Sequence, residues 1–290
     1  MRICSKAVAA ALLLIAGTSG CMVLRKGMEA ATAPLADNLA KSLQKQSDLQ
    51  LVREGVPAYL LLLDALVESS PDNPKLLLAA ADAQTAYASA FVEPAEAGRA
   101  VAMYAKARDY GLSVLRRNRA FRRVWDKPLE QFETAIPSFR KRDVPALYTT
   151  AMAWIGWIIS SQDSMQALSE LSKAMALMRR VAALEPGCQH GGVEMVFGIY
   201  YAVQPRGGGQ DLAQAKAHFE RAFAYAGPDA LLPRVAFAEF YARLAFDREL
   251  FEKTLRAVIA HQTDPPEFRL LNAVARQRAQ ALLDKADEFF

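Results

Sequence analysis

The sequence contains few of the residues that form cross-links and metal sites. Its 290 residues include three cysteines and three histidines. Cys188 and His190 stand two positions apart, but no second pair of ligands accompanies them, which makes a zinc site a poor fit. His218 and His261 each stand alone in a helical pattern. We therefore expect no bound metal and no other cofactor.

Motifs of common catalytic sites are missing as well. The sequence has neither the Gly-x-Ser-x-Gly of serine hydrolases nor the His-Glu-x-x-His of zinc proteases. A glycine run at 207–209 precedes a helix, but Gln210 and Asp211 follow where a phosphate-binding loop requires lysine and then serine or threonine. A carboxylate at that helix start would also repel phosphate. We interpret Asp211 as a helix N-cap and expect a protein that is not an enzyme.

Sequence patterns of β-strands are scarce, because alternating valine, isoleucine and threonine rarely occur. Alanine and leucine dominate instead, and hydrophobic residues make up 52% of the chain against 23% charged residues. This composition excludes a disordered chain and predicts an all-α fold. Helical patterns separated by short breakers cover residues 56–74, 75–92, 95–117, 144–161, 164–184, 191–203, 207–229, 231–246, 247–261 and 266–286.

The chain also lacks a strong excess of one charge. Its formal net charge is +4, and loss of Arg2 and Lys6 with an N-terminal export segment leaves +2. This near-balance argues against a nucleic-acid-binding protein. The stretch from Arg116 to Arg142 is an exception, since it holds nine Lys/Arg and three Asp/Glu. It either meets an acidic partner or anionic headgroups, or forms a solvated loop whose arginines cap helix ends; we favour the solvated loop.

The first 20 residues have the features of an export signal. Arg2 and Lys6 supply positive charge, residues 7–17 form an apolar run, and the small residues at 18–21 (TSGC) suit a cleavage site. The apolar run is too short to span a bilayer, which requires about 20 residues. Residues 1–20 are therefore predicted to be a signal peptide.

Cys21 directly follows the predicted cleavage site, as the acylated cysteine of a bacterial lipoprotein does. We predict lipidation at Cys21, although Thr18 stands where leucine is usual. An ordinary secretory peptide with an incidental cysteine is the alternative. Met22 in place of aspartate leaves no inner-membrane retention signal, so a periplasm-facing anchor in the outer membrane is expected. With Cys21 acylated, Cys188 has no partner in the mature chain, and the core must hold without disulfides.

Residues 21–50 are predicted to form the anchor, a spacer and the lead-in to the first helix, and residues 51–290 contain helical repeats. The second helix of a tetratricopeptide hairpin carries a small residue, a large one four positions later and a small one three after that. Segments that match in whole or in part are Ala100, Tyr104 and Ala107; Ala174, Met178 and Val181; Ala215, Phe219 and Ala222; and Leu250, Thr254 and Ala257.

The first helices of these hairpins carry small residues at corresponding places, among them Gly156, Gly198 and Ala238. A single hairpin cannot bury its own apolar face. We therefore predict four degenerate tetratricopeptide-like hairpins in one solenoid-like domain, closed by a C-terminal capping helix at 266–286. An irregular helical bundle with chance matches is the alternative.

Aromatic residues on the first helices are the candidates for a ligand or partner surface. In tetratricopeptide arrays those helices line the concave side, where rings can contact a ligand. The alternative is that rings at helical spacing belong to the core. The candidates are Trp154, Trp157, Tyr200, Tyr201 and Tyr241.

These features together resemble the T component of TRAP transporters. The resemblance is carried by the export signal, by the degenerate hairpins, and by the segments GGGQDLAQAKAHFERAF at 207–223, LLPRVAFAEFYARLAFDRELFEKTLRAVI at 231–259 and FRLLNAVARQRAQALL at 268–283. It implies a lipid-anchored, periplasm-facing accessory protein that docks the substrate-binding P subunit of a TRAP system. It also implies a homo-oligomer, with a trimer expected, and a passage for a hydrophobic or organic-acid ligand. A generic envelope scaffold using the same helical surface for other proteins is the alternative.

Lipidation at Cys21 predicts that radiolabelled palmitate enters the wild-type chain and does not enter a Cys21→Ser variant, because acylation requires the thiol. The measurement is autoradiography of the chain isolated from labelled bacteria. A Cys188→Ser variant serves as the control and should keep the label. Absence of label from the wild-type chain would contradict the prediction.

Overall fold

The computed structural model describes residues 38–93, 96–161, 163–204 and 209–290. The predicted signal peptide at 1–20 and the lipidation site Cys21 lie outside the described residues, as do two glycines of the run at 207–209. The region that the hairpin prediction concerns is thus almost entirely described.

The all-α prediction is confirmed, since the described residues contain helices and turns and no β-strand. Most predicted ranges agree with observed helices to within a few residues. The helices are α2 (Leu49–Ser69), α3 (Pro74–Tyr87), the π-helical η1 (Ala88–Val92), α4 (Ala97–Leu115), α5 (Arg119–Arg122), α6 (Leu129–Glu133), η2 (Ile136–Ser138), η3 (Lys141–Asp143), α7 (Val144–Ser160), α8 (Met165–Ser169), α9 (Leu171–Leu184), α10 (Cys188–Val203), α11 (Leu212–Ala226), α12 (Leu232–Ala236), the π-helical η4 (Phe237–Ala242), α13 (Arg248–Ala260), α14 (Arg269–Asp284) and α15 (Ala286–Phe289).

Carboxylate and amide side chains set several helix starts. The side chain of Asp211 accepts a hydrogen bond from the Gln214 backbone N–H at 2.8 Å, which confirms the predicted N-cap. That bond also lowers the pKa of Asp211. Helix α2 begins before the predicted start at residue 56, because Asp48 caps it by accepting a hydrogen bond from Leu51 N at 2.9 Å.

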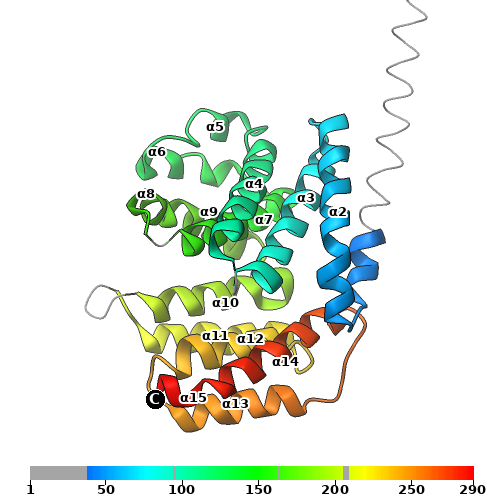
Figure 1. Cartoon of the computed structure of the whole chain (residues 1–290). Helices are drawn as coiled ribbons and strands as arrows, with labels where there is room; N and C mark the ends of the chain where they lie inside the picture. Colours follow the sequence, from blue (N-terminus) through cyan, green and yellow to red (C-terminus); the bar gives the residue numbers. More distant parts are fainter. Residues whose placement is uncertain (1–37, 94–95, 162, 205–208) are drawn as a thin grey trace, which may run out of the picture.

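Neighbouring helices pack in the pairs that the repeat pattern predicts. α3 packs on α4, α7 on α9, α10 on α11, and η4 with α12 on α13. α4 also packs on α7, so the first two hairpins stack directly. Figure 1 shows these helices as layers, with α10 and α11 between the α3–α9 part and the α13–α15 part. The arrangement is consistent with a degenerate tetratricopeptide-like stack.

The last long helix closes the structure against the first one. α14 packs on α12 and α13 and also contacts α2 (Figure 1). Arg269 donates a hydrogen bond from Nη1 to the Lys45 carbonyl at 3.3 Å, and Leu270 packs against the cluster that contains Val52 and Val56. The predicted capping helix therefore covers the final hairpin and also ties the C-terminal part of the chain to its N-terminal helices.

Large side chains of second helices pack onto glycines of first helices. Phe219 of α11 lies against Gly198 of α10, where an added Cβ would stand 2.8 Å from the ring. Tyr104 of α4 covers Gly156 of α7 in the same way. Phe219 is fully buried and Tyr104 nearly so. The small-and-large pattern read from the sequence therefore marks the points where helix backbones approach most closely.

Replacing Gly198 by alanine should lower the free energy of unfolding by about 1–3 kcal/mol, because the new methyl group overlaps the Phe219 ring. The matched control is Gly55→Ala in α2, where an added Cβ meets nothing within 4 Å. That control should raise stability by up to about 1 kcal/mol, because alanine favours helix more than glycine does. Urea unfolding followed by circular dichroism measures both. Equal effects of the two substitutions would contradict the close-packing interpretation.

Candidate functional site

The five aromatic side chains selected from the sequence do not form a single cluster. Trp154 and Trp157 belong to α7, Tyr200 and Tyr201 to α10, and Tyr241 to η4. The rings of α7 and α10 belong to or pack against one core cluster, whereas Tyr241 packs against the cluster that contains Phe219 and Phe237. The exposure of each ring therefore depends on its own neighbours.

Trp154 is a core residue. Its side chain is buried, with 3% of its surface exposed, and its indole Nε1 donates a hydrogen bond to Glu170 Oε2 at 2.7 Å. Its ring also makes an edge contact with Phe132, with centroids 6.2 Å apart. Trp154 is therefore a core residue, as the alternative interpretation predicts, and it takes no part in an exposed surface.

Trp157 and Tyr241 are half-buried and keep part of each ring open. The guanidinium of Arg108 lies over the Trp157 ring, 4.3 Å from its centroid, which is a cation–π contact. Tyr241 stacks on Phe237, with centroids 4.8 Å apart and an interplanar angle of 19°. Both rings are held in place by a partner on one side, which makes them rigid surface elements.

Tyr201 stacks on a charged network that the sequence did not reveal. Glu194 of α10 accepts hydrogen bonds from Arg221 Nε at 2.8 Å and pairs with His218 Nδ1 at 2.7 Å. Its carboxylate is buried, with 8% of the residue exposed. The His218 ring is stacked on Tyr201 at 5.3 Å and 16° and lies near Phe197 at 5.2 Å. His218, which stands alone in the sequence, is paired in space.

The Glu194 network has a clear physical role. A buried carboxylate is costly unless charged groups and hydrogen bonds compensate it, and Arg221 and His218 of α11 do so. The network therefore fixes α10 against α11 and orients the Tyr201 ring. No group of three or more His, Cys, Asp or Glu that could hold a metal occurs in the described part of the chain.

Two further polar side chains, Asp82 and Tyr148, lie on the face formed by α3 and α7. We call this face the Tyr148 face. It comprises Leu78 and Asp82 of α3 and Tyr148, Met152 and Ile155 of α7; the four apolar and aromatic side chains pack against the main core cluster and remain half-buried. Asp82 keeps access to solvent, yet desolvation by the surrounding protein raises the pKa of its carboxyl. The same effect and the nearby Asp82 charge raise the pKa of Tyr148.

Neither Asp82 nor the Tyr148 hydroxyl has a hydrogen-bond or ion-pair partner among the residues that the structure describes. The Tyr148 hydroxyl lies against α10, where a Cβ added at Gly192 would stand 2.6 Å from it. Polar groups that are desolvated but unpaired within a protein are available to a bound molecule. The Tyr148 face thus offers two hydrogen-bonding groups within an apolar surface.

The start of α10 borders this face and has an unusual backbone, a kink within the helix. Gln189, His190 and Gly191 are consecutive residues with positive φ, at 52°, 51° and 80°. Gly191 is required there, because a Cβ would lie 2.6 Å from the Ala222 carbonyl oxygen. The His190 ring meets the edge of Phe268, with centroids 4.8 Å apart. Left-handed conformations cost energy for residues other than glycine, so the surrounding packing must hold this turn in place.

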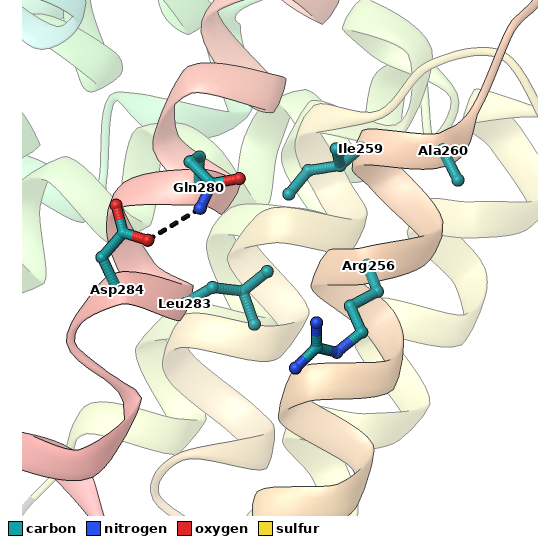
Figure 2. A pocket seen from close by; sticks show the side chains of 6 residues that line it. All are labelled: Arg256, Ile259, Ala260, Gln280, Leu283 and Asp284. Carbon is teal, nitrogen blue, oxygen red and sulfur yellow. Dashed lines mark hydrogen bonds between the residues drawn. The ribbon is translucent and has the colours of Figure 1, made fainter.

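An open groove lies at the other end of the molecule, between α13 and α14. It has a volume of about 500 Å³. Figure 2 shows its lining residues, which are Arg256, Ile259, Ala260, Gln280, Leu283 and Asp284. Gln280 donates a hydrogen bond to Asp284 at 2.7 Å, and Arg256 pairs with Glu252 at 3.1 Å. Because these polar groups already have partners, the groove is better suited to packing another helix than to holding a polar ligand.

The described chain thus combines paired helices, partly exposed aromatic side chains and the Tyr148 face. A family model for the TRAP transporter T-component matches residues 45–290. The chain therefore belongs to this family of transporter components. It is also 23% identical over 322 aligned positions to an uncharacterized protein of Treponema pallidum (strain Nichols), an alignment that covers all of this chain and 98% of that relative. Within the described residues, no helix is both long and apolar enough to cross a membrane.

The thiol of Cys188, next to the left-handed turn, should react slowly in the folded protein. Burial and the charge of Glu185 raise the pKa of this thiol from 9.0 to about 11. At pH 8 the reactive thiolate is then about 100-fold scarcer than for an exposed cysteine, and the residue is only 9% exposed. Iodoacetamide labelling of the acylated chain should be at least about 100-fold slower when folded than in urea. Similar rates in both states would contradict this environment for Cys188.

Proposed function

We propose that this chain is a non-enzymatic, lipid-anchored accessory protein of a TRAP transport system. It docks the periplasmic substrate-binding subunit and passes on a hydrophobic or organic-acid ligand. The match of residues 45–290 to the T-component family carries this proposal. The lipid on Cys21 holds the protein to the periplasmic side of the outer membrane, and the chain works as a homo-oligomer, with a trimer expected.

The Tyr148 face supports the ligand part of the proposal. Met152, Ile155 and Leu78 supply an apolar surface that remains half-buried, which suits a hydrophobic molecule. Asp82 and Tyr148 supply the polar contacts. Because desolvation raises the pKa of Asp82, its carboxyl takes up a proton more readily than an ordinary aspartate.

The ordered rings support the docking part of the proposal. Trp157, Tyr200, Tyr201 and Tyr241 are half-buried, and their neighbours restrict their movement. Large rings that are already immobile lose little entropy when a partner covers them, and such residues dominate protein interfaces. These four rings on α7, α10 and η4 are the proposed contact points for the substrate-binding subunit.

The docking proposal predicts a complex with the cognate substrate-binding subunit at micromolar concentrations, measured by analytical ultracentrifugation. Trp157→Ala should weaken this complex by at least about tenfold, because truncating an interface aromatic removes much of the binding energy. Leu61→Ala is the control, since Leu61 is an exposed apolar residue on α2, a helix that carries none of the four rings. Absence of any complex for the wild-type protein, with other envelope proteins co-purifying instead, would favour a generic scaffold.

A further inference from the structure

The basic stretch from Arg116 to Arg142 folds into a compact unit between α4 and α7. Phe121 of α5 lies at its centre, fully buried, and makes edge contacts with Phe132 at 5.2 Å and Phe139 at 5.3 Å. The Asn118 side chain donates a hydrogen bond to Ser138 Oγ at 2.8 Å and joins the two ends of the unit. The stretch is therefore not a loose loop, and its charged residues project from a fixed aromatic core.

Two arginines of this stretch have local structural roles. Arg116 lies over the Trp125 ring, 5.0 Å from its centroid, and donates a hydrogen bond to Ser113. Arg117 donates a hydrogen bond to the carbonyl of Asp72, in the turn that follows α2. Only Arg117 bonds to a backbone carbonyl, just beyond the end of α2, whereas the contacts of Arg116 are with side chains. The remaining basic residues require another explanation.

α5 presents three arginines on the side opposite its buried ring. Successive helical residues are rotated by about 100°, so Arg119, Arg122 and Arg123 share one face and Phe121 points the other way. All three arginines are exposed. Arg140, Lys141 and Arg142 directly follow Phe139, whose ring packs against Phe121, and all three are exposed. We call Arg119, Arg122, Arg123, Arg140, Lys141 and Arg142 the basic platform.

The positive charge of the platform is left uncompensated. Arg142 is 83% exposed and has only a distant pair with Asp143 at 3.9 Å. The other five basic side chains have no ion-pair partner in the described part of the chain. Exposed cations without counter-charges repel one another, which destabilises the fold slightly unless an external anion meets them. The platform is therefore suited to contact with a negatively charged partner.

The composition of the platform indicates which kind of anionic partner it meets. Protein interfaces depend on buried aromatic and aliphatic anchors, and single-stranded nucleic acids require exposed rings for stacking. Here the phenylalanines are buried, and none of the large exposed hydrophobic residues of the described chain lies between residues 116 and 143. Charge without anchors suits a surface of mobile anionic groups, such as phospholipid headgroups.

We propose that the basic platform lies against the anionic phospholipid surface of the membrane and orients the helical stack on it. A lipid on Cys21 would hold the described part of the chain near the bilayer, since the 16 residues from Met22 to Asp37 can span at most about 60 Å. Figure 1 shows α5 and α6 at the end of the molecule opposite α13. The contact would therefore direct the α13–α15 end away from the membrane. This proposal does not depend on docking to a TRAP subunit.

The test uses the full 290-residue chain with Cys21→Ser, synthesised without cells so that no acyl chain is present. Binding is measured by co-flotation with phosphatidylcholine vesicles and with vesicles containing about one quarter phosphatidylglycerol. The platform variant combines Arg119→Gln, Arg122→Gln and Arg123→Gln. It should bind anionic vesicles at least about tenfold more weakly than the parent chain, because each basic residue near an anionic leaflet adds to affinity. Neutral vesicles should not distinguish the two chains.

A matched control removes the same charge elsewhere. It combines Arg53→Gln, Arg99→Gln and Arg256→Gln, three exposed arginines on α2, α4 and α13. The control should bind anionic vesicles like the parent chain, and circular dichroism should show both variants to be folded. Salt at about 0.5 M should abolish the difference between the platform variant and the parent, since it screens charge beyond a few ångströms.

Two outcomes would overturn the proposal. Equal losses for the platform variant and the control would show that only net charge matters. Binding of soluble polyglutamate to the platform, without a preference for anionic vesicles, would assign the surface to an acidic protein partner instead. Failure of the TRAP subunit to bind would leave the vesicle result unaffected, so the two proposals are tested separately.

Discussion

The packing of α10 on both of its sides is the constraint on which the rest of the structure depends. Val196 and Phe197 are buried in the core cluster formed by α7 and α9, whereas Met195 and Ile199 pack against the cluster that contains Phe219 and Phe237. One helix thus contributes to two cores. Gly198 allows α11 to approach closely enough for Phe219 to fill the second core. Without α10, the N-terminal and C-terminal hairpins would meet mainly through α14 and α2.

The left-handed turn at the start of α10 follows from this constraint. α9 and α10 pack together far less than the two helices within each neighbouring hairpin, so the chain must change direction sharply between them. Gln189 and His190 accept a conformation that costs L-residues about 1–2 kcal/mol each. The contact of Gly191 with the Ala222 backbone and the contact of His190 with Phe268 hold the turn from α11 and from the start of α14. Strain at this place is offset by the packing that it makes possible.

The sequence predicted the features that depend on local pattern. The helices, their pairing and the small-and-large contacts at Gly198 and Gly156 follow from periodicity, because close helix packing demands small residues at fixed spacing. The N-cap at Asp211 follows from its side-chain chemistry. The early start of α2 was missed, because the predicted range began at residue 56, whereas Asp48 caps the helix and it continues through Pro57.

The candidate site was harder to predict, because its pairings join residues far apart in the sequence. Glu194 and His218 stand 24 positions apart, and only the α10–α11 contact makes them partners. Asp82 and Tyr148 belong to different hairpins and meet through the packing of α3 on α7. Trp154 and Trp157 look equivalent in the sequence, yet only the first is fully buried. Exposure of an aromatic ring depends on which neighbouring helix covers it, which periodicity alone does not specify.

Charged and apolar surfaces lie on different parts of the molecule. The basic platform keeps its aromatic rings inside and its cations outside, whereas the Tyr148 face leaves apolar groups half open around two unpaired polar groups. The first arrangement attracts anionic surfaces through long-range fields and discriminates little between them. The second acts only at contact and selects by shape and hydrogen bonding. The basic platform lies on α5, on η3 and at their ends, whereas the Tyr148 face lies on α3 and α7. The two proposals assign the first surface to membrane contact and the second to ligand contact, so each can be altered by substitutions that leave the other in place.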